Sequence, residues 1–425
     1  MKSHDIADTA FELLTGDDGR DDDLPDCAQE AEHGNFLRHM GALTLSKIAD
    51  GLLDPKLVLS FLLSALGAPA ALIGMLVPVR EAGALLPQLF TASRIRAMAR
   101  RKWAWTLGAA GQAVGAGVIV FAALTLSGLA AGVAIVAALG LVAVSRSVCS
   151  VAYKDVLGKT VGKPRRGTVT GSAGSIASVI VALFAVLLIA NLIPRQDLVI
   201  GAVAAAASCF ALAAVIFAGL REPAQPAEGD HVGLSQLSLL GTDDDLRRFV
   251  IVRCLLLPTA LAPPYLVVLS ARAGEDVFQG LGVMMLATAL AGVSSAYIWG
   301  RLSDHSSRLV LALAGGAAAV FLILAIALDL AGQSATQWAI PLCLFGVMIA
   351  YQGVRNSRST YLVNLAPEDR RASYTAVANT VVGAVLIAMG GIGALSGLIG
   401  VTGILGVFAA LSIAGAAIGF TLKEV

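Results

Sequence analysis

Long apolar runs separated by short polar segments occupy most of the chain. A helix that crosses a bilayer needs about 20 consecutive apolar residues, because every backbone N–H and C=O group must be hydrogen-bonded inside the segment. Runs of this kind cover 39–65, 70–92, 103–125, 129–152, 168–191, 198–219, 248–269, 279–300, 309–330, 338–361, 374–395 and 398–421. The pattern predicts an all-α integral membrane protein with twelve transmembrane helices. Pro258, Pro263 and Pro264 should kink the seventh helix.

Basic residues gather in alternate loops between these runs. One set of loops includes Arg100 to Lys102 and Arg165–Arg166, whereas the opposite set carries only Arg195 and Arg272. Lys and Arg are retained on the cytoplasmic side of a membrane. We therefore expect both termini in the cytoplasm. Arg outnumbers Lys by 22 to 8, a bias typical of GC-rich bacterial genomes, so we expect the bacterial cytoplasmic (inner) membrane.

The longest polar connection divides the runs six and six. The expected parts are an acidic, disordered cytoplasmic tail at 1–37, a first six-helix bundle at 38–219, a cytoplasmic linker at 220–247, a second bundle at 248–421 and a short cytoplasmic C-terminus at 422–425. The halves echo each other, since Arg146 stands nine residues before Asp155 and Arg355 nine before Asn364. Parallel halves are how many secondary transporters build a central pathway.

A short motif follows the eighth run. The chain there reads Gly300-Arg301-Leu302-Ser303-Asp304-His305-Ser306-Ser307-Arg308. This resembles the loop signature G-x-L-x-D-x-x-x-R of the major facilitator superfamily. The resemblance implies two pseudo-symmetric six-helix bundles and a cytoplasmic gate. Gly300 would allow a tight exit from the helix, and Asp304 would lock helix ends through arginine pairs.

Two features depart from that family pattern. The corresponding loop of the first half, from Gly83 to Lys102, contains no acidic residue, so its gate cannot use the same ion pair. Gly167, Gly171 and Gly174 lie at the start of the fifth run, which lacks the Gly-Pro pair of drug–proton antiporters. This second absence disfavours, without excluding, efflux of hydrophobic compounds.

Charged residues inside the first two runs are the first candidates for a pathway. Lys47, Asp50 and Asp54 share one helical face, and Asp54 and Arg80 are equally far from the turn between the two runs. We expect Asp54 to contact Arg80 or Glu81 near the midplane. Asp54 or Glu81 would carry a coupling proton, and Arg80 would hold an anionic group of the substrate. Alternatively, these charges neutralise one another and set helix register, which is the role we favour for Lys47 and Asp50.

A second group of charges lies towards the cytoplasmic ends of the fourth and tenth runs. Arg146, Arg355 and Arg358 are expected to form a gate with Asp155, Asp304 and Arg308. Charges inside the bilayer are costly and need a reason. Lys47, Lys56, Arg80, Arg146, Arg253, Arg355 and Arg358 stand against Asp50, Asp54, Glu81 and Asp155. This surplus of cations favours an anion as the substrate.

Enzymatic function finds no support in the residue pattern. The five histidines share no metal-ligand spacing, and no phosphate-binding loop for ATP is present. The net charge of +1 gives no reason to expect nucleic acid as a partner. We predict a monomeric, proton-coupled permease for a small solute, without a cofactor. The alternatives are an efflux pump for hydrophobic compounds and a membrane sensor or assembly factor that does not transport.

Overall fold

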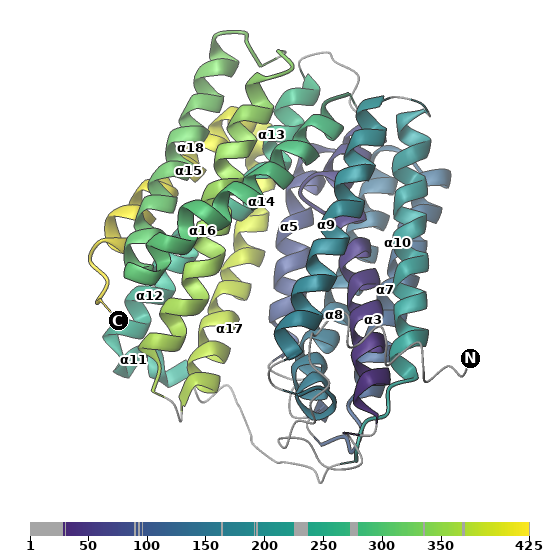
Figure 1. Ribbon diagram of the computed structural model, residues 1–425. Coiled ribbons are helices and arrows are strands. Elements are labelled where there is room, and N and C mark those ends of the chain that lie inside the picture. Colours follow the sequence, from purple (N-terminus) through teal and green to yellow (C-terminus); the bar gives the residue numbers. More distant parts are fainter. Residues whose placement is uncertain are drawn as a thin grey trace.

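The computed structural model describes residues 29, 31–88, 91, 94–95, 97–162, 165–190, 192, 194–224, 237–272, 279–334, 336–367 and 370–424. The elements in these ranges are helices, so the prediction of an all-α fold is confirmed (Figure 1). Eight of the spans they form are long and apolar enough to cross a membrane. The helices of the other four predicted runs are broken, shorter or carry more charge.

The helices divide into two halves that lie side by side (Figure 1). The first half contains α3 (Glu32–Leu52), α4 (Val58–Ala65), α5 (Ala70–Leu85), α7 (Lys102–Thr125), α8 (Gly128–Thr160), α9 (Arg166–Ala190) and α10 (Arg195–Ala218). The second contains α11 (Leu239–Thr242), α12 (Asp244–Leu255), α13 (Pro258–Arg272), α14 (Gln279–His305), α15 (Ser307–Leu330), α16 (Ala339–Leu365), α17 (Arg371–Gly390), the 3₁₀ helix η4 (Gly391–Leu395) and α18 (Ser396–Gly419). Each predicted run overlaps one helix or one interrupted helix.

Helix packing in one half repeats in the other. The pairs α7–α8, α7–α10, α3–α10 and α5–α8 of the first half recur as α15–α16, α15–α18, α12–α18 and α14–α16 in the second. Two of the contacts between the halves, α5–α17 and α9–α14, are related in the same way. The interrupted helix α3–α4 therefore corresponds to α12–α13, and α8 corresponds to α16.

The first span of each half is interrupted at a proline. Pro55 follows Asp54 between α3 and α4, and Pro258 is the first residue of α13, directly after Leu256 and Leu257, which separate it from α12. Proline has no N–H to donate and its ring clashes with the preceding turn, which explains both breaks. Pro263 and Pro264 lie inside α13 without ending it. Of the three prolines expected to kink this span, Pro258 alone interrupts the helix.

One end of the molecule holds the start of α3, the segment after α10 and the C-terminal residues, and we call it the linker end. Asn35 in the first turn of α3 exchanges two hydrogen bonds with the backbone of Arg221, of 2.9 and 3.0 Å. Tyr361 donates a 2.9 Å hydrogen bond to the carbonyl of Lys423 at the other terminus. The start of α3 thus lies beside the segment after α10, and α16 lies beside the C-terminal residues at the same end of the other half (Figure 1). The opposite end, with the α4–α5 turn, is the far end.

The helix α3 begins at Glu32, inside the segment 1–37 that the sequence marks as a tail. Glu32 is buried, and its carboxylate accepts hydrogen bonds of 2.8 Å from the backbone of Gly162 and from Arg165. This ion pair attaches the start of α3 to the α8–α9 connection. Residues 1–28 lie outside the described part of the chain.

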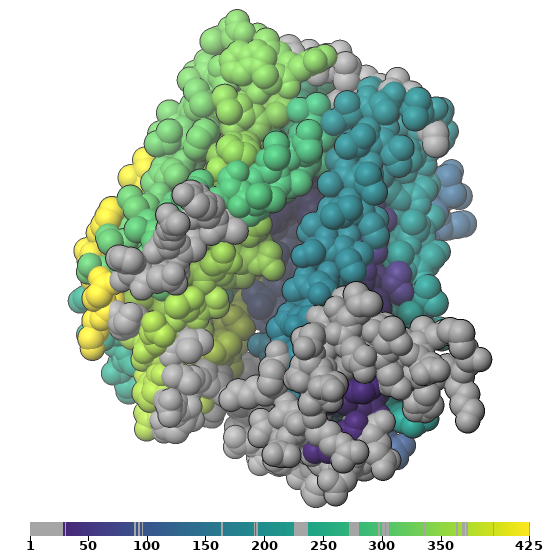
Figure 2. Space-filling model, in the orientation of Figure 1, coloured from purple at the N-terminus to yellow at the C-terminus, as the bar shows by residue number. Residues whose placement is uncertain are grey.

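The molecular surface is hollowed between the two halves. Figure 2 shows the hollow between α9 and α17, towards the linker end. Glycines allow close approach where the halves meet: a Cβ built at Gly282 of α14 would lie 2.9 Å from the carbonyl oxygen of Ala185 in α9. The backbones of α9 and α14 therefore pack closely. Between α9 and α17, towards the linker end, the two halves leave a cleft.

Gly282→Ala should weaken this contact. Overpacking of this kind costs about 1–3 kcal/mol, because the carbonyl of Ala185 belongs to the backbone of α9 and must shift. The matched control is Gly292→Ala in the same helix, where an added Cβ meets nothing within 4 Å. Thermal unfolding of both variants in detergent is the measurement. Equal unfolding midpoints would show that α9 and α14 do not pack closely at Gly282.

Candidate functional site

Asp54 lies in the break between α3 and α4. Its Oδ1 accepts hydrogen bonds of 2.9 Å from the backbone N–H groups of Lys56 and Leu57. The carboxylate thereby satisfies N–H groups that the interrupted helix leaves free. In this turn the Asp54 carboxylate binds the backbone of its own segment. The arginines of α5 and α8 pair with a different carboxylate, that of Asp50.

Asp50 forms the centre of the ion-pair network in the first half. Its Oδ1 lies 2.7 Å from Arg80 Nη2 on α5, and its Oδ2 lies 2.7 Å from Arg146 Nη1 on α8. Arg146 also donates a 3.1 Å hydrogen bond to Ser46. The expected contact of Arg80 with Asp54 is therefore replaced by one with Asp50. The expectation treats the first span as one unbroken helix, whereas at the break the Asp54 carboxylate accepts hydrogen bonds from the N–H groups of Lys56 and Leu57.

Lys47 and Glu81 lie beside this network. Lys47 donates a 2.9 Å hydrogen bond from Nζ to the carbonyl of Thr170, which joins α3 to α9. Glu81 is half-buried and forms no ion pair within the described residues. Among the described residues, no hydrogen bond joins Glu81 to Asp54, so this expected contact is not observed.

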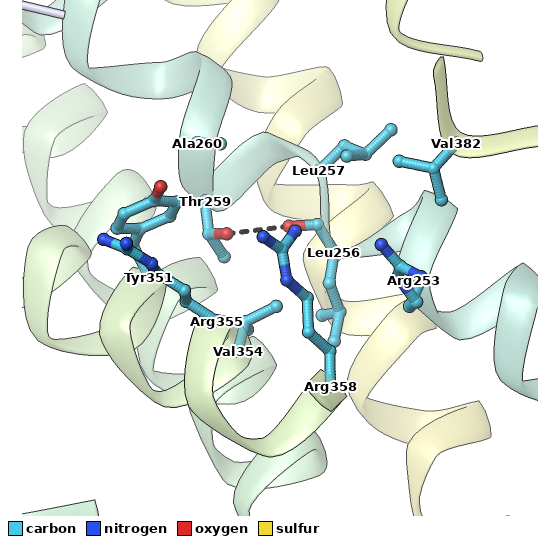
Figure 3. Close-up of a pocket in the computed structure, with 10 residues that line it drawn as sticks. All are labelled: Arg253, Leu256, Leu257, Thr259, Ala260, Tyr351, Val354, Arg355, Arg358 and Val382. Carbon is cyan, nitrogen blue, oxygen red and sulfur yellow. Dashed lines mark hydrogen bonds between the residues drawn. The ribbon is translucent and has the colours of Figure 1, made fainter. Parts of the chain in front are cut away.

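The second half holds a pocket rich in arginine. Arg253 of α12 and Arg355 and Arg358 of α16 line it, together with Tyr351, Thr259 and apolar residues around the α12–α13 break (Figure 3). Arg253 is buried, and it donates a 3.3 Å hydrogen bond to the side-chain oxygen of Asn379. None of the described residues that line the pocket is acidic.

Figure 3 shows how the three guanidinium groups are placed. Arg358 points towards the break, beside Thr259 and Leu256, whose hydroxyl and carbonyl form a 2.8 Å hydrogen bond. Arg355 extends towards Tyr351, and Arg253 approaches from the opposite side. The pocket thus concentrates positive charge where helix α12 stops.

Lys56 connects the two halves at this pocket. It is buried, and its Nζ lies 3.3 Å from the centroid of the Tyr351 ring, a cation–π contact. Because Lys56 follows Pro55, the break in the first span carries its side chain across to α16. From the sequence, Lys56 counts only among the cations inside the bilayer, and this contact is not predicted. The signal for this contact is the proline, which ends the helical register before Lys56.

The charges at the linker end are paired differently from the expected gate. Asp155 pairs with Arg101 and with Lys159 at 2.9 Å, so it is not the partner of Arg146. Arg308 lies 2.7 Å from Glu424 and donates a 3.0 Å hydrogen bond to the carbonyl of Leu422.

Two other residues of the expected gate, Arg355 and Arg358, form no ion pair among the described residues. Gly300 and Asp304 belong to the last turns of α14, but their side-chain surroundings lie outside the described residues. A gating role for these residues, and for Arg355 and Arg358, stays a prediction.

Comparison with known proteins identifies the family. A family model described as the Major Facilitator Superfamily matches residues 40–391. The chain belongs to the major facilitator superfamily. Members of this superfamily are transporters, so the chain is a multi-pass membrane transporter. No curated protein matches it.

Solved transporters of the major facilitator superfamily share this fold. The nucleoside transporter NupG, crystallised as a point mutant, is 13% identical with a TM-score of 0.70, over 91% of this chain and 99% of that chain. A POT family transporter in complex with a thioalcohol-conjugated peptide is 11% identical with a TM-score of 0.69, over 91% and 95%. The inward-open xylose transporter XylE from E. coli is 10% identical with a TM-score of 0.64, over 92% and 96%. At these identities the likeness shows the fold alone.

The Asp50 network can be tested by a double-mutant cycle. Asp50→Asn should lower the unfolding temperature because it leaves Arg80 and Arg146 without their shared carboxylate. Adding Arg146→Gln should recover part of the loss, with a coupling free energy of about 0.5–3 kcal/mol. Thermal unfolding of the wild type, both single variants and the double variant gives this value. Additive effects would show that Asp50 and Arg146 do not interact.

Proposed function

We propose that this transporter carries a small anion across the bacterial cytoplasmic membrane by alternating access, coupled to protons. The supporting observation is the arginine pocket of the second half, whose described lining contains Arg253, Arg355 and Arg358 and no acid. A single charge at mid-bilayer costs at least about 2.5–3.5 kcal/mol. Three cations without a carboxylate are retained most simply because a bound anion neutralises them.

The first half supports the same substrate class. Arg80 and Arg146 share one carboxylate, that of Asp50, and Lys47 is held by a backbone carbonyl. With Lys56, the first half has four cations, Lys47, Lys56, Arg80 and Arg146, against the three carboxylates of Asp50, Asp54 and Glu81, and the arginines of the second half add most of the positive charge. Such a field raises the local concentration of anions and attracts them into the cleft.

The basic loops support an orientation with the linker end in the cytoplasm. Arg100 to Lys102 and Arg165–Arg166 belong to connections at that end. Both termini then lie in the cytoplasm, and the cleft opens inwards. Movement of the halves about the α5–α17 and α9–α14 contacts would open the far end in turn.

Asp54 and Glu81 are the proposed proton carriers. Asp54 lies at the break between α3 and α4, and Glu81 follows Arg80 on α5. A carboxyl group near an arginine can exchange a proton when the substrate anion changes the local charge. Proton binding and anion binding would thereby be linked.

Anion transport is testable in proteoliposomes that contain the purified protein. A panel of carboxylates, phosphate and neutral sugars or nucleosides would be applied outside, and uptake of radiolabelled solute measured. Saturable uptake of an anion, competed by other anions and not by neutral solutes, is the expected result. Saturable uptake restricted to neutral solutes would refute an anionic substrate.

Proton coupling is testable with matched carboxyl variants. Asp54→Asn keeps an oxygen that can cap α4, so it removes the charge while leaving the turn. We expect this variant or Glu81→Gln to lose anion-driven proton flux, measured with a pH-sensitive dye inside the vesicles. Asp197→Asn, an exposed change in the first turn of α10, is the control and should keep the flux. Wild-type flux in both pathway variants would remove these residues from the coupling route.

A further inference from the structure

The two halves place different charges at corresponding positions. Helix packing relates α3 to α12 and α8 to α16. Asp50 stands four residues before the Asp54–Pro55 break, and Arg253 stands four residues before the Leu257–Pro258 break. The second half therefore carries a guanidinium where the first carries its central carboxylate.

The partners of these two residues correspond as well. Asp50 reaches Arg146 on α8 at 2.7 Å, whereas Arg253 shares a pocket with Arg355 and Arg358 on α16. In the first half the network is closed by its own carboxylate. In the second half, cations from both helices face the same space, and no carboxylate of the described lining joins them.

We propose that this pocket binds an oxyanion group of the substrate, a carboxylate or a phosphate, in the place that the Asp50 carboxylate occupies in the first half. The proposal rests on the proposed function and specifies its binding site and substrate class. Guanidinium groups recognise planar or tetrahedral oxyanions through paired N–H donors. Thr259 at the helix break adds a hydroxyl to the same wall.

The surroundings of the pocket suit the charged group of a ligand. The cavity volume is about 20 Å³, so only that group would enter the pocket and the rest of the ligand would lie in the cleft. Arg253 is oriented by Asn379, and Tyr351 closes one side with Lys56 packed on its ring. Because Lys56 comes from the first half, a ligand in the pocket would lie where the two halves meet.

Binding to the purified full-length protein tests the site. Calorimetry and thermal unfolding would be measured with inorganic phosphate, acetate and succinate as separate probes, and with xylose and uridine as neutral controls. The phosphate and carboxylate arms decide which oxyanion is preferred. We expect an anion to bind the wild type saturably and to raise its unfolding temperature.

Two variants and one control locate the anion. Arg355→Gln removes one exposed cation of the pocket and should weaken anion binding at least about tenfold. Arg253→Asp builds a carboxylate that pairs with the α16 arginines, as Asp50 pairs with Arg146, and should abolish anion binding in a folded protein. Arg195→Gln removes the same charge at the far end of the molecule, beside Leu188, and should bind anions like the wild type.

The outcomes separate this proposal from the broader one. Anion binding that persists unchanged in Arg355→Gln and Arg253→Asp would overturn the site and leave anion transport standing. Binding of neutral probes with no response to any anion would overturn both. If Arg253→Asp does not fold, anion binding by Arg355→Gln alone tests the site. The Arg355 side chain is exposed, so its replacement should not impair folding.

Discussion

A charge in the interior of a bilayer must be paired, hydrated or bound to a ligand. This constraint organises the centre of the molecule. Asp50 satisfies Arg80 and Arg146 in the first half, and a backbone carbonyl holds Lys47. The second half meets the constraint only in part, through Asn379 and exposure to the cleft. The contrast between a closed network and an open one is what gives the otherwise similar halves different chemistry.

Proline decides where this chemistry is placed. The breaks at Pro55 and Pro258 end a helix in the middle of the first span of each half. A break frees backbone groups and releases the following residues from the register of the preceding helix. At the first break, the Asp54 carboxylate accepts a hydrogen bond from the backbone of Lys56, and the Lys56 side chain packs on Tyr351. At the second break, Arg358 lies beside the end of α12 (Figure 3). Irregular backbone at membrane depth is tolerated where it lines a cavity.

The fold was predictable because apolar length and basic loops depend on local sequence. For the candidate site, the sequence indicates which charged residues lie in these helices but not how they pair. Treating the first span as one helix put Asp54 at the centre, whereas the break gives that place to Asp50. Arg146 was matched with Asp155 by proximity along α8, but Asp155 lies on the side of the helix that meets Arg101. Partners across helices depend on rotation and tilt, which residue spacing does not determine.

The excess of arginine in the cleft has a consequence for energetics under a membrane voltage. Moving one elementary charge through 100 mV changes the free energy by about 2.3 kcal/mol. When the cleft is empty, its fixed cations would shift within this field as the halves rock. When an anion neutralises them, the same movement would carry less net charge. The return of the empty carrier, rather than the loaded step, would then be the part of the cycle that responds most strongly to voltage.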